Sequence, residues 1–599
     1  MVESRDDAAL LAAKSTHVSP DPSVPARRVP RVFAFSLGVG ALALLVFQMG
    51  FVGEVTPELH AGTAALSLLF ALEQVWAWKL GRAKPSWTSK GGLLLAEAVL
   101  VLAVMFGLVI AGWLGDHDTK LELLAHALVQ GIILVTLTLR GLRHQARLTA
   151  VTLRPGWLLI GSFSFIILVG TFLLKMPRAV EAGQHLTWLD AFFTSTSAVC
   201  VTGLTLHNTA TFFTPTGQMI LLALFQTGGL GIMTLTFFMA ALLFQGMSLH
   251  DRFLLGEMIA EKRLAHVGET LRFIVVFTFV TEALGALAIF FALPNDHPAA
   301  ERAFHAVFHS VSAFCNAGFS TFENGMADDW VRNKTLIQVI LFLLSVAGGL
   351  GSLVVYDGLS FLQQRFRRWR DPDRQRPRLR VHTRLVFVMT IGLLIGATPL
   401  YYMSEYLFHI GESNGGEWMT AFFYAGAART SGFNTVDMGD IGAVTIHVLV
   451  FLMLIGGSPG GTAGGLRTTV IAVAAMHLWQ QLRGINRIVL FRRRLSEDVG
   501  SRALGVIVLA MGWLFVNFAI LRQLQPVASD TVLFFELVSA FSTAGLSLDL
   551  TPNLTSGAKI LILLNMFIGR VGLLTIIVTL MPLGKKSKHV YPQEDILLV

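Results

Sequence analysis

Long apolar runs, separated by short polar segments, make up most of the chain. Each run holds about 20 residues, which is the length that an α-helix needs to cross the hydrocarbon core of a bilayer. The runs begin near Val32, Ala61, Leu93, Leu123, Trp157, Gln218, Phe273, Leu336, Arg384, Val444, Ala503 and Ala558. This pattern predicts about twelve membrane-spanning helices.

Four further apolar segments are too short to cross a bilayer. They cover residues 188–199, 303–315, 418–430 and 532–542, and each lies between two longer runs. A segment that cannot cross must enter and leave the membrane on the same side. The sequence therefore predicts four re-entrant hairpins.

Each short segment ends in a similar motif. The four motifs read SAVCVTGL (197–204), SAFCNAGF (312–319), GAARTSGF (426–433) and SAFSTAGL (539–546). Their glycines, Gly203, Gly318, Gly432 and Gly545, are 115, 114 and 113 residues apart. Such a regular period indicates one structural unit used four times, and repeated membrane units can surround a common axis. We therefore expect an all-α polytopic membrane protein with four helix–pore helix–helix (M1-P-M2) units around a central pore.

This period divides the chain into regions. Residues 1–30 lack a hydrophobic period and are expected to form a disordered cytoplasmic tail. Residues 31–142 hold about four additional transmembrane helices, interpreted as a scaffold or a dimer contact. The four units are expected at residues 143–250, 251–364, 365–482 and 483–599, the last including a cytoplasmic C-terminus.

Composition and charge place the chain in a membrane and orient it. Hydrophobic residues make up 54% and charged residues 14% of the chain, with a mean hydropathy of +0.64, which excludes an ordinary soluble protein. Basic connections at 27–31, 79–90, 140–154, 365–384, 483–502 and 585–586 alternate with acidic or neutral ones at 54–58, 116–122, 181–190, 296–301 and 405–417. Because basic loops stay inside, both termini are expected in the cytoplasm and the hairpins enter from outside. The net charge of +8 follows from this rule, so membrane lipid is the expected partner and nucleic acid is not.

The motif glycines have the chemistry of an ion filter. Non-helical backbone at membrane depth must be buried in protein or line a water-filled cavity, and glycine can adopt a positive φ that turns neighbouring carbonyls toward the axis. A carbonyl ring can replace the hydration shell of K⁺. The predicted filter comprises Val201, Thr202, Gly203, Asn316, Ala317, Gly318, Thr430, Ser431, Gly432, Thr543, Ala544 and Gly545, and K⁺ is expected at the carbonyls of Thr202, Ala317, Ser431 and Ala544. The alternative is close helix packing through small residues, but four copies at matched spacing favour the filter.

A glycine-rich stretch interrupts the second long run of the third unit. Residues 456–465 contain six glycines and one proline, which cost about 1 and about 3 kcal/mol each within a helix. We expect a loop within the membrane that acts as a mobile barrier beneath the filter; a static kink is the alternative. The predicted gate comprises Gly456, Gly457, Ser458, Pro459, Gly460, Gly461, Thr462, Gly464, Gly465 and Arg570.

Arg570 is included in this gate because it lies inside the last apolar run, which would bring its charge near the loop if the fourth unit faces the axis. An arginine at mid-helix costs ~2.5–3.5 kcal/mol unless it finds a partner or water. It is expected to repel cations or to donate to the free carbonyls of the loop. Snorkelling to the inner interface would have to span about 20 Å of helix, so it is not favoured.

The motifs also carry a family resemblance. The strings TSAVCVTGLT, HSVSAFCNAGFSTF, AARTSGFNT and VSAFSTAGLS resemble the four filter regions of the Trk/Ktr/HKT superfamily of K⁺ transporters, over residues 155–584. The resemblance implies K⁺ uptake across the bacterial inner (plasma) membrane, one main K⁺ site level with the four glycines, a homodimer with one pore per subunit, and a cytoplasmic nucleotide-binding regulatory subunit. Serine in place of the first filter glycine is associated with Na⁺ selectivity in that family, so Gly203 favours K⁺. No cofactor is expected beyond the transported K⁺, with Na⁺ as a possible activator.

Several other polar residues have open roles. Arg429 and Glu536 lie on neighbouring short segments, where pairing is one option; Asp190 and Glu417 lie at outer segment ends and either attract cations or cap helices. His305 and His309 are four residues apart, but without a third ligand we expect packing and hydrogen bonding rather than metal binding. Cys200 and Cys315 are expected to pack as small residues.

The sequence therefore favours a K⁺ channel or transporter over an enzyme. The alternative within this class is a Na⁺- or H⁺-coupled K⁺ symporter, which intramembrane acids would favour, although the pore runs contain few of them. The alternative from another class is a polytopic membrane enzyme, which needs polar residues converging in a cleft.

Overall fold

The computed structural model describes residues 37, 40, 44, 47, 50, 57–80, 155–243, 267–328, 330–331, 334–371, 377–408, 418–429, 431–436, 438–485, 487–496 and 498–580. The chain divides into two compact regions, Met1–Thr149 and Ala150–Val599. In the first region, helix α3 (Pro57–Leu80) contains the apolar run predicted from Ala61. The predicted tail at 1–30 and the runs from Leu93 and Leu123 lie outside the described residues.

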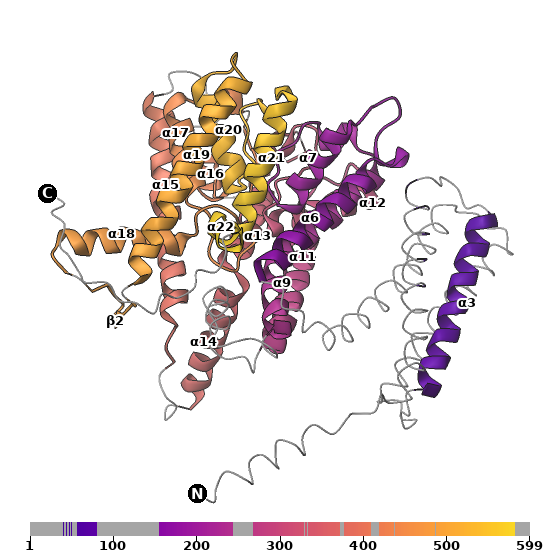
Figure 1. Cartoon of the computed structure of the whole chain (residues 1–599), viewed down its shortest axis with the longest axis horizontal. Helices are drawn as coiled ribbons and strands as arrows, with labels where there is room; N and C mark the ends of the chain where they lie inside the picture. Colours follow the sequence, from indigo (N-terminus) through magenta and orange to yellow (C-terminus); the bar gives the residue numbers. More distant parts are fainter. Residues whose placement is uncertain are drawn as a thin grey trace, which may run out of the picture. The chain divides into compact units, whose positions relative to one another are not determined.

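In the described part of the second region, four short helices, α7, α12, α16 and α20, each lie between a long helix and a second helix or bent helix pair (Figure 1). The first two sets are α6 (Pro155–Leu174), α7 (Trp188–Val199) and α9 (Pro215–Leu243), then α11 (Val267–Ala292), α12 (Ala299–Cys315) and α13 (Thr335–Leu350) with α14 (Ser352–Arg370). The last two sets are α15 (Val381–Phe408), α16 (Trp418–Ala427) and α17 (Ala443–Leu454) with α18 (Thr468–Leu482), then α19 (Asp498–Leu524), α20 (Asp530–Ser542) and α21 (Ser556–Val571) with α22 (Leu573–Leu580). The all-α fold predicted from the sequence is confirmed.

Within the described residues, the connections contain short elements. These are η1 (Pro177–Ala179), α8 (Thr209–Phe212), η3 (Gly325–Ala327), η4 (Met438–Asp440) and η5 (Thr551–Asn553). Strands β1 (Val489–Leu490) and β2 (Arg493–Arg494) form an antiparallel hairpin in which Val489 pairs with Arg494 and Leu490 with Arg493.

The sets close into a ring through their long helices. The long helix that follows each short helix packs against the short helix of the next set: α9 on α12, α13 on α16, α17 on α20, and α21 on α7. The last contact joins the end of the chain to its first set. This cyclic packing brings the four short helices around one axis.

Three described helices are long and apolar enough to cross a membrane, and the number rises to five if each bent pair forms one span. The three are most of α11 (Arg272–Ala292), most of α15 (Val381–Tyr406) and all of α19 (Asp498–Leu524). The bent pairs are α13 with α14, at 97°, and α21 with α22, at 89°. The sequence analysis missed both bends. They occur at Gly351 and Gly572, whose φ values of +84° and +95° cannot continue a right-handed helix.

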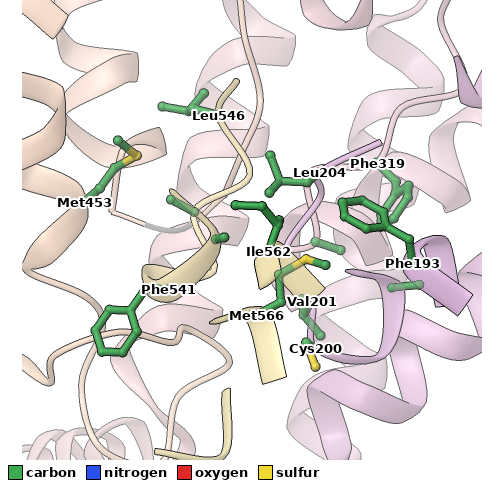
Figure 2. Close-up of a cluster of buried hydrophobic side chains, with 14 of the residues drawn as sticks. Phe193, Cys200, Val201, Leu204, Phe319, Met453, Phe541, Leu546, Ile562 and Met566 are labelled. Carbon is green, nitrogen blue, oxygen red and sulfur yellow. The ribbon is translucent and has the colours of Figure 1, made fainter. Parts of the chain in front are cut away.

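A hydrophobic core surrounds the motifs at the ends of the short helices. Figure 2 shows Val201 and Leu204 of the first motif close to Ile562 and Met566 of α21, all four of them buried. Outward-facing residues on the long helices are also apolar: the exposed fraction of Phe165 on α6 is 67%. Apolar side chains on both the inside and the outside suit a bundle surrounded by lipid. Cys200 and Cys315 are buried and not disulfide-bonded, consistent with their expected packing role.

Candidate functional site

The four motif glycines meet at the centre of the ring of short helices. Their φ values lie between +69° and +92°, a region that glycine enters without the penalty of a β-carbon. A β-carbon built on each glycine would approach the carbonyl oxygen of the residue before the next glycine. These approaches pair Gly203 with Ala317 (2.5 Å), Gly318 with Ser431 (3.0 Å), Gly432 with Ala544 (2.9 Å) and Gly545 with Thr202, the closest contact. The glycines thus form a closed ring, accompanied by the four carbonyls predicted to hold K⁺.

Local hydrogen bonds set the direction of this backbone. The N–H of the residue before each glycine donates back into its short helix or the helix end: Thr202 to Ser197 O (2.8 Å), Ala317 to Ser312 O (2.7 Å), Ser431 to Ala427 O (3.0 Å) and Ala544 to Ser539 O (2.9 Å). One residue earlier, Val201, Asn316 and Thr543 adopt left-handed conformations with φ of 57°, 60° and 49°. A non-glycine residue in this conformation raises the free energy of the folded state by about 1–3 kcal/mol, so the surrounding structure must hold it there. The predicted filter residue Thr430 lies outside the described residues.

The predicted gate segment forms a closed loop. Ile455 and Leu466 form an isolated bridge, and the N–H of Gly456 donates to Leu466 O (2.9 Å). The loop is anchored to the end of α13, because the N–H of Ser458 donates to Gly349 O (3.2 Å) and that of Thr462 to Gly348 O (3.2 Å). The segment therefore replaces a continuous helix with a loop fixed at several points.

This loop lies directly against two of the four motifs, the second and the fourth. Asn316 Nδ2 donates to Thr462 Oγ1 (2.7 Å), and a β-carbon on Gly464 would collide with the side chain of Thr543. A β-carbon on Gly465 would lie 3.1 Å from Ser542 Cα. The loop thus contacts the backbone reversals that end α12 and α20.

Arg570 joins the loop to two other units. Its side chain is 1% exposed, and its guanidinium donates to Thr462 O of the loop and to Gly228 O of α9 (2.9 Å). The predicted contact with loop carbonyls is therefore present. Arg467, which the sequence analysis did not single out, also donates to a loop carbonyl, that of Ala463.

Glycines allow the long helices to approach the short ones closely. A β-carbon on Gly228, Gly348 or Gly569 would collide with the carbonyl oxygen of Val199, Phe314 or Phe541, respectively. The sequence signal for this packing is a pair of adjacent glycines that recurs at 228–229, 348–349 and 456–457 in the first three units. At the corresponding position the fourth unit has Gly569 followed by Arg570. Comparing the long runs with one another would have shown that Arg570 replaces the second glycine of a repeated pair.

An acid within the bundle was also missed. Glu282 on α11 is 4% exposed, and its carboxylate accepts a hydrogen bond from Gln226 Nε2 (3.0 Å). Cys315 donates to Gln226 Oε1 (3.2 Å). This polar cluster therefore includes a residue of the second motif, Cys315.

A cavity of about 960 Å³ opens beyond the glycine ring, and all four glycines line it. Its charged lining includes Glu323, Asp440 and Asp549. Carboxylates in a cleft raise the local concentration of cations. The sequence analysis had considered this role, as one of two alternatives, for Asp190 and Glu417, but Glu417 lies outside the described residues.

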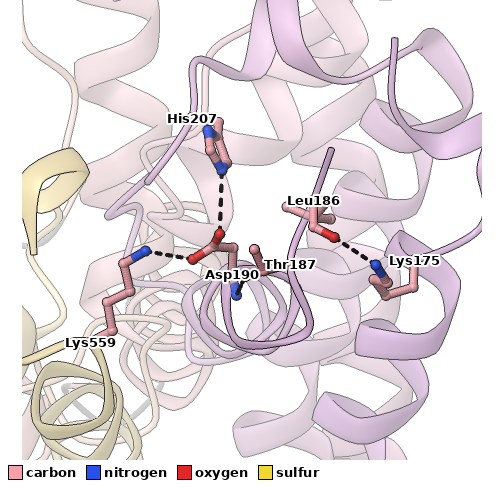
Figure 3. Close-up of polar contacts among 6 residues, drawn as sticks. All are labelled: Lys175, Leu186, Thr187, Asp190, His207 and Lys559. Atoms are coloured by element: carbon pink, nitrogen blue, oxygen red, sulfur yellow. Dashed lines mark hydrogen bonds and ion pairs between the residues drawn. The ribbon is translucent and has the colours of Figure 1, made fainter. Parts of the chain in front are cut away.

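Asp190 instead belongs to an ion pair that closes the ring (Figure 3). Its Oδ1 lies 2.6 Å from Lys559 Nζ of α21, and its N–H donates to the capping side chain of Thr187. Asp190 Oδ2 lies 3.9 Å from His207 Nε2. Burial lowers the pKa of His207 below its ordinary value, while the Asp190 carboxylate opposes that shift. The residue that caps α7 is Thr187, and the Asp190 carboxylate is engaged by Lys559, a partner that neither expectation for Asp190 included.

The possible pairing of Arg429 with Glu536 does not form. Glu536 accepts hydrogen bonds from Ser547 (2.9 Å) and Thr551 instead. The two histidines form hydrogen bonds, as expected: His305 Nδ1 lies 2.6 Å from Thr321 Oγ1, and His309 Nε2 lies 2.9 Å from Ser320 Oγ. The described residues contain no cluster of three metal-binding side chains.

Comparisons with known proteins agree with this architecture. The family model TrkH, described as a cation transport protein, matches residues 125–589. The Ktr system potassium uptake protein B of Vibrio alginolyticus is 33% identical over 441 residues, covering 73% of this chain and 93% of that protein. The potassium/sodium uptake protein NtpJ of Enterococcus hirae is 31% identical over 453 residues, covering 74% and 97%. The crystal structure of the potassium transporter TrkH from Vibrio parahaemolyticus has a TM-score of 0.59 and 17% identity, covering 87% of this chain and 98% of that one, which shows a shared fold.

Proposed function

Because the chain belongs to the TrkH family of cation transport proteins, we propose that it carries K⁺ into the cell through the glycine ring. One observation supports this proposal: around the ring, each glycine lies against the carbonyl oxygen of the residue that precedes the next glycine. Four such carbonyls around one axis can replace the hydration shell of a monovalent cation. An inside-negative potential of 100 mV would drive each charge inward with about 2.3 kcal/mol.

The gate follows from the position of the 456–465 loop. The loop contacts the second and fourth motifs, and Arg570 fixes it to α9 through Gly228. A loop held in this way blocks the path beneath the filter, and its release would open that path. Arg570 also places a positive charge beside the path, which opposes cation passage while the loop is in place.

The remaining predictions on organisation are part of this proposal. The four units at 143–250, 251–364, 365–482 and 483–599 would sit in the inner membrane with both termini in the cytoplasm. The homodimer, the nucleotide-binding regulatory subunit and activation by Na⁺ stay predictions from the family resemblance. The relatives are named as uptake proteins rather than enzymes, so a membrane enzyme is not favoured.

Coupled transport is a second candidate, supported by Glu282. A carboxyl buried within the bundle beside the filter can exchange a proton during a transport cycle, a feature that the sequence analysis considered scarce. H⁺-coupled symport would make K⁺ uptake depend on an imposed pH gradient at constant membrane potential.

The test is ion flux into liposomes that contain the purified chain, with an inside-negative potential and K⁺ or Na⁺ supplied alone or together. We expect K⁺ flux without Na⁺, and a fall in the K⁺/Na⁺ permeability ratio in Gly203→Ser, because the added side chain would displace the Ala317 carbonyl. Gly161→Ser is the matched control, since a β-carbon at Gly161 on α6 would meet nothing within 4 Å apart from its chain neighbours and the backbone of its own helix. An unchanged ratio in Gly203→Ser would remove the glycine ring from the filter role. An added pH gradient that accelerates uptake at constant potential would identify the coupled mechanism.

A further inference from the structure

A second ring of polar side chains lies two residues beyond the glycine ring. Each filter glycine is followed, after one apolar residue, by a polar one: Thr205, Ser320, Asn434 and Ser547. All four line the outer cavity together with the glycines themselves. The same offset in all four units places these oxygen-bearing side chains at one level of the pore.

The hydroxyl of Ser320 donates its proton to one acceptor, His309. His309 Nδ1 lies 2.7 Å from His305 O, and a carbonyl can only accept, so Nδ1 carries the proton of the ring. His309 is 1% exposed, which disfavours a second proton and leaves Nε2 as an acceptor. The hydroxyl of Ser320, 2.9 Å away, therefore donates to Nε2. Ser320 Oγ accepts the N–H of Phe322 (3.1 Å) and keeps one lone pair.

Ser547 has an equivalent partner in the fourth unit. Its hydroxyl donates to Glu536 Oε2 (2.9 Å), and the Glu536 side chain is fully buried. Thr551 Oγ1 lies 3.0 Å from Ser547 Oγ, so at least one lone pair of Ser547 also stays available. In both serines the single proton is directed away from the cavity.

The two supporting residues occupy the same position in their units. His309 precedes Gly318 by nine residues, and Glu536 precedes Gly545 by nine residues. The equivalent residues of the first and third units are Thr194 and Phe423. Because the glycines follow the order 203, 318, 432, 545 around the ring, the second and fourth units lie diagonally across the axis. The two serine oxygens therefore face a common axis from opposite sides.

We propose that Thr205, Ser320, Asn434 and Ser547 form an outer binding site for a monovalent cation, in which His309 and Glu536 act as positioning residues that direct the serine hydroxyl protons away from the cavity and leave an oxygen lone pair for the cation. This inference rests on the proposed transport function and adds a site before the carbonyl ring. The site exchanges part of the hydration shell for hydroxyl and amide oxygens, and the carboxylates of Glu323, Asp440 and Asp549 on the cavity lining supply cations to it.

The experiment measures initial rates of K⁺ uptake into liposomes over a range of external K⁺ concentrations. We expect Ser320→Ala and Ser547→Ala each to raise the KM for K⁺ about fivefold, because each variant loses one polar ligand of the cation. The maximal rate should change less. The matched control is Thr321→Ala, because Thr321 also bonds a histidine of α12 but does not line the cavity. An equal rise of KM in Thr321→Ala would show that the loop structure, not a ligand, was lost, and would overturn the proposal.

The positioning role has its own readout. His309→Leu removes the acceptor and should raise KM as Ser320→Ala does, and the double variant should show no further rise. His309→Gln keeps a side-chain oxygen that can accept from Ser320, so it should restore a KM near that of the unchanged protein. Additive effects in the double variant would exclude the role of His309. If the unchanged protein transports K⁺ selectively but neither serine variant alters KM, only the outer site fails; if the unchanged protein carries no K⁺, the transport proposal itself fails.

Discussion

Removal of the Arg570 side chain is expected to open the pore under resting conditions. Its guanidinium donates to Thr462 O and to Gly228 O, so it joins the loop of the third unit to the long helix of the first. A hydrogen bond from a charged group contributes about 1.5–3 kcal/mol. Water that enters a vacated pore would satisfy part of what the two carbonyls lose. We therefore expect Arg570→Ala to shift the loop equilibrium toward release by about 2 kcal/mol, or about 30-fold.

Arg570→Lys separates the two ways in which this residue can act. Lysine keeps the charge but not the planar fork that reaches two carbonyls at once. If the hydrogen bonds hold the loop, the lysine variant should leak at a rate between those of the unchanged protein and the alanine variant. If charge repulsion alone blocks the pore, the lysine variant should remain as closed as the unchanged protein.

The assay is basal Rb⁺ or K⁺ flux into liposomes at matched protein density, with thermal unfolding in detergent measured in parallel. Arg522→Ala is the matched control, because Arg522 also donates to two carbonyls in the fourth unit, at Pro526 and Ala528, but not to the loop. Equal basal flux in Arg570→Ala and the unchanged protein, with both folded, would refute the gate role. Leakage in Arg522→Ala would show that general loosening of the fourth unit is sufficient.

Two further predictions concern the ion pair that closes the ring. Asp190→Asn should destabilise the protein by about 3 kcal/mol, because it leaves the charge of Lys559 unpaired in a mostly buried site, and Asp190→Asn with Lys559→Met should recover part of this loss; equal melting temperatures for the single and double variants would contradict this coupling. For His207, burial lowers the pKa below the ordinary 6.5, so the folded state binds fewer protons than the unfolded state, and stability should fall as the pH drops from about 6.5 through the lower folded value. His207→Gln should remove this component of the melting-temperature profile, and an unaltered profile would exclude His207 as its source.

The short helices show how far local sequence determines this structure. The predicted segments 188–199 and 532–542 correspond to α7 (Trp188–Val199) and α20 (Asp530–Ser542). Their boundaries depend on local signals: Thr187 and Ser529 cap the first turns, and the backbone reverses at the motifs. The glycine period also predicted which residues would meet at the axis, because four equivalent units must place equivalent residues together.

Partners distant in the chain could not be predicted in this way. Lys559 pairs with Asp190 across 369 residues, and no local pattern distinguishes that lysine from one at the membrane surface. Glu536 was considered with Arg429 because both lie on short helices, yet its hydrogen-bond donors are Ser547 and Thr551 on the loop that follows its own helix. The bends at Gly351 and Gly572 were missed because each depends on a single glycine within an apolar run, where glycine is also compatible with a continuous helix.

The cyclic contact of the glycines has a consequence for how ion preference can diverge. In a channel built from four identical chains, one codon change alters all four quadrants of the filter at once. Here one codon change alters a single quadrant, and the carbonyl displaced belongs to the neighbouring unit, as when a β-carbon at Gly318 approaches Ser431 O. In the proposed filter, selectivity can therefore change one quarter of the ring at a time, and the first such change leaves the other three contacts unaltered. A ring built from four unequal units of one chain therefore allows the preference among alkali cations to change gradually. In a symmetric tetramer the same change would have to occur in one step.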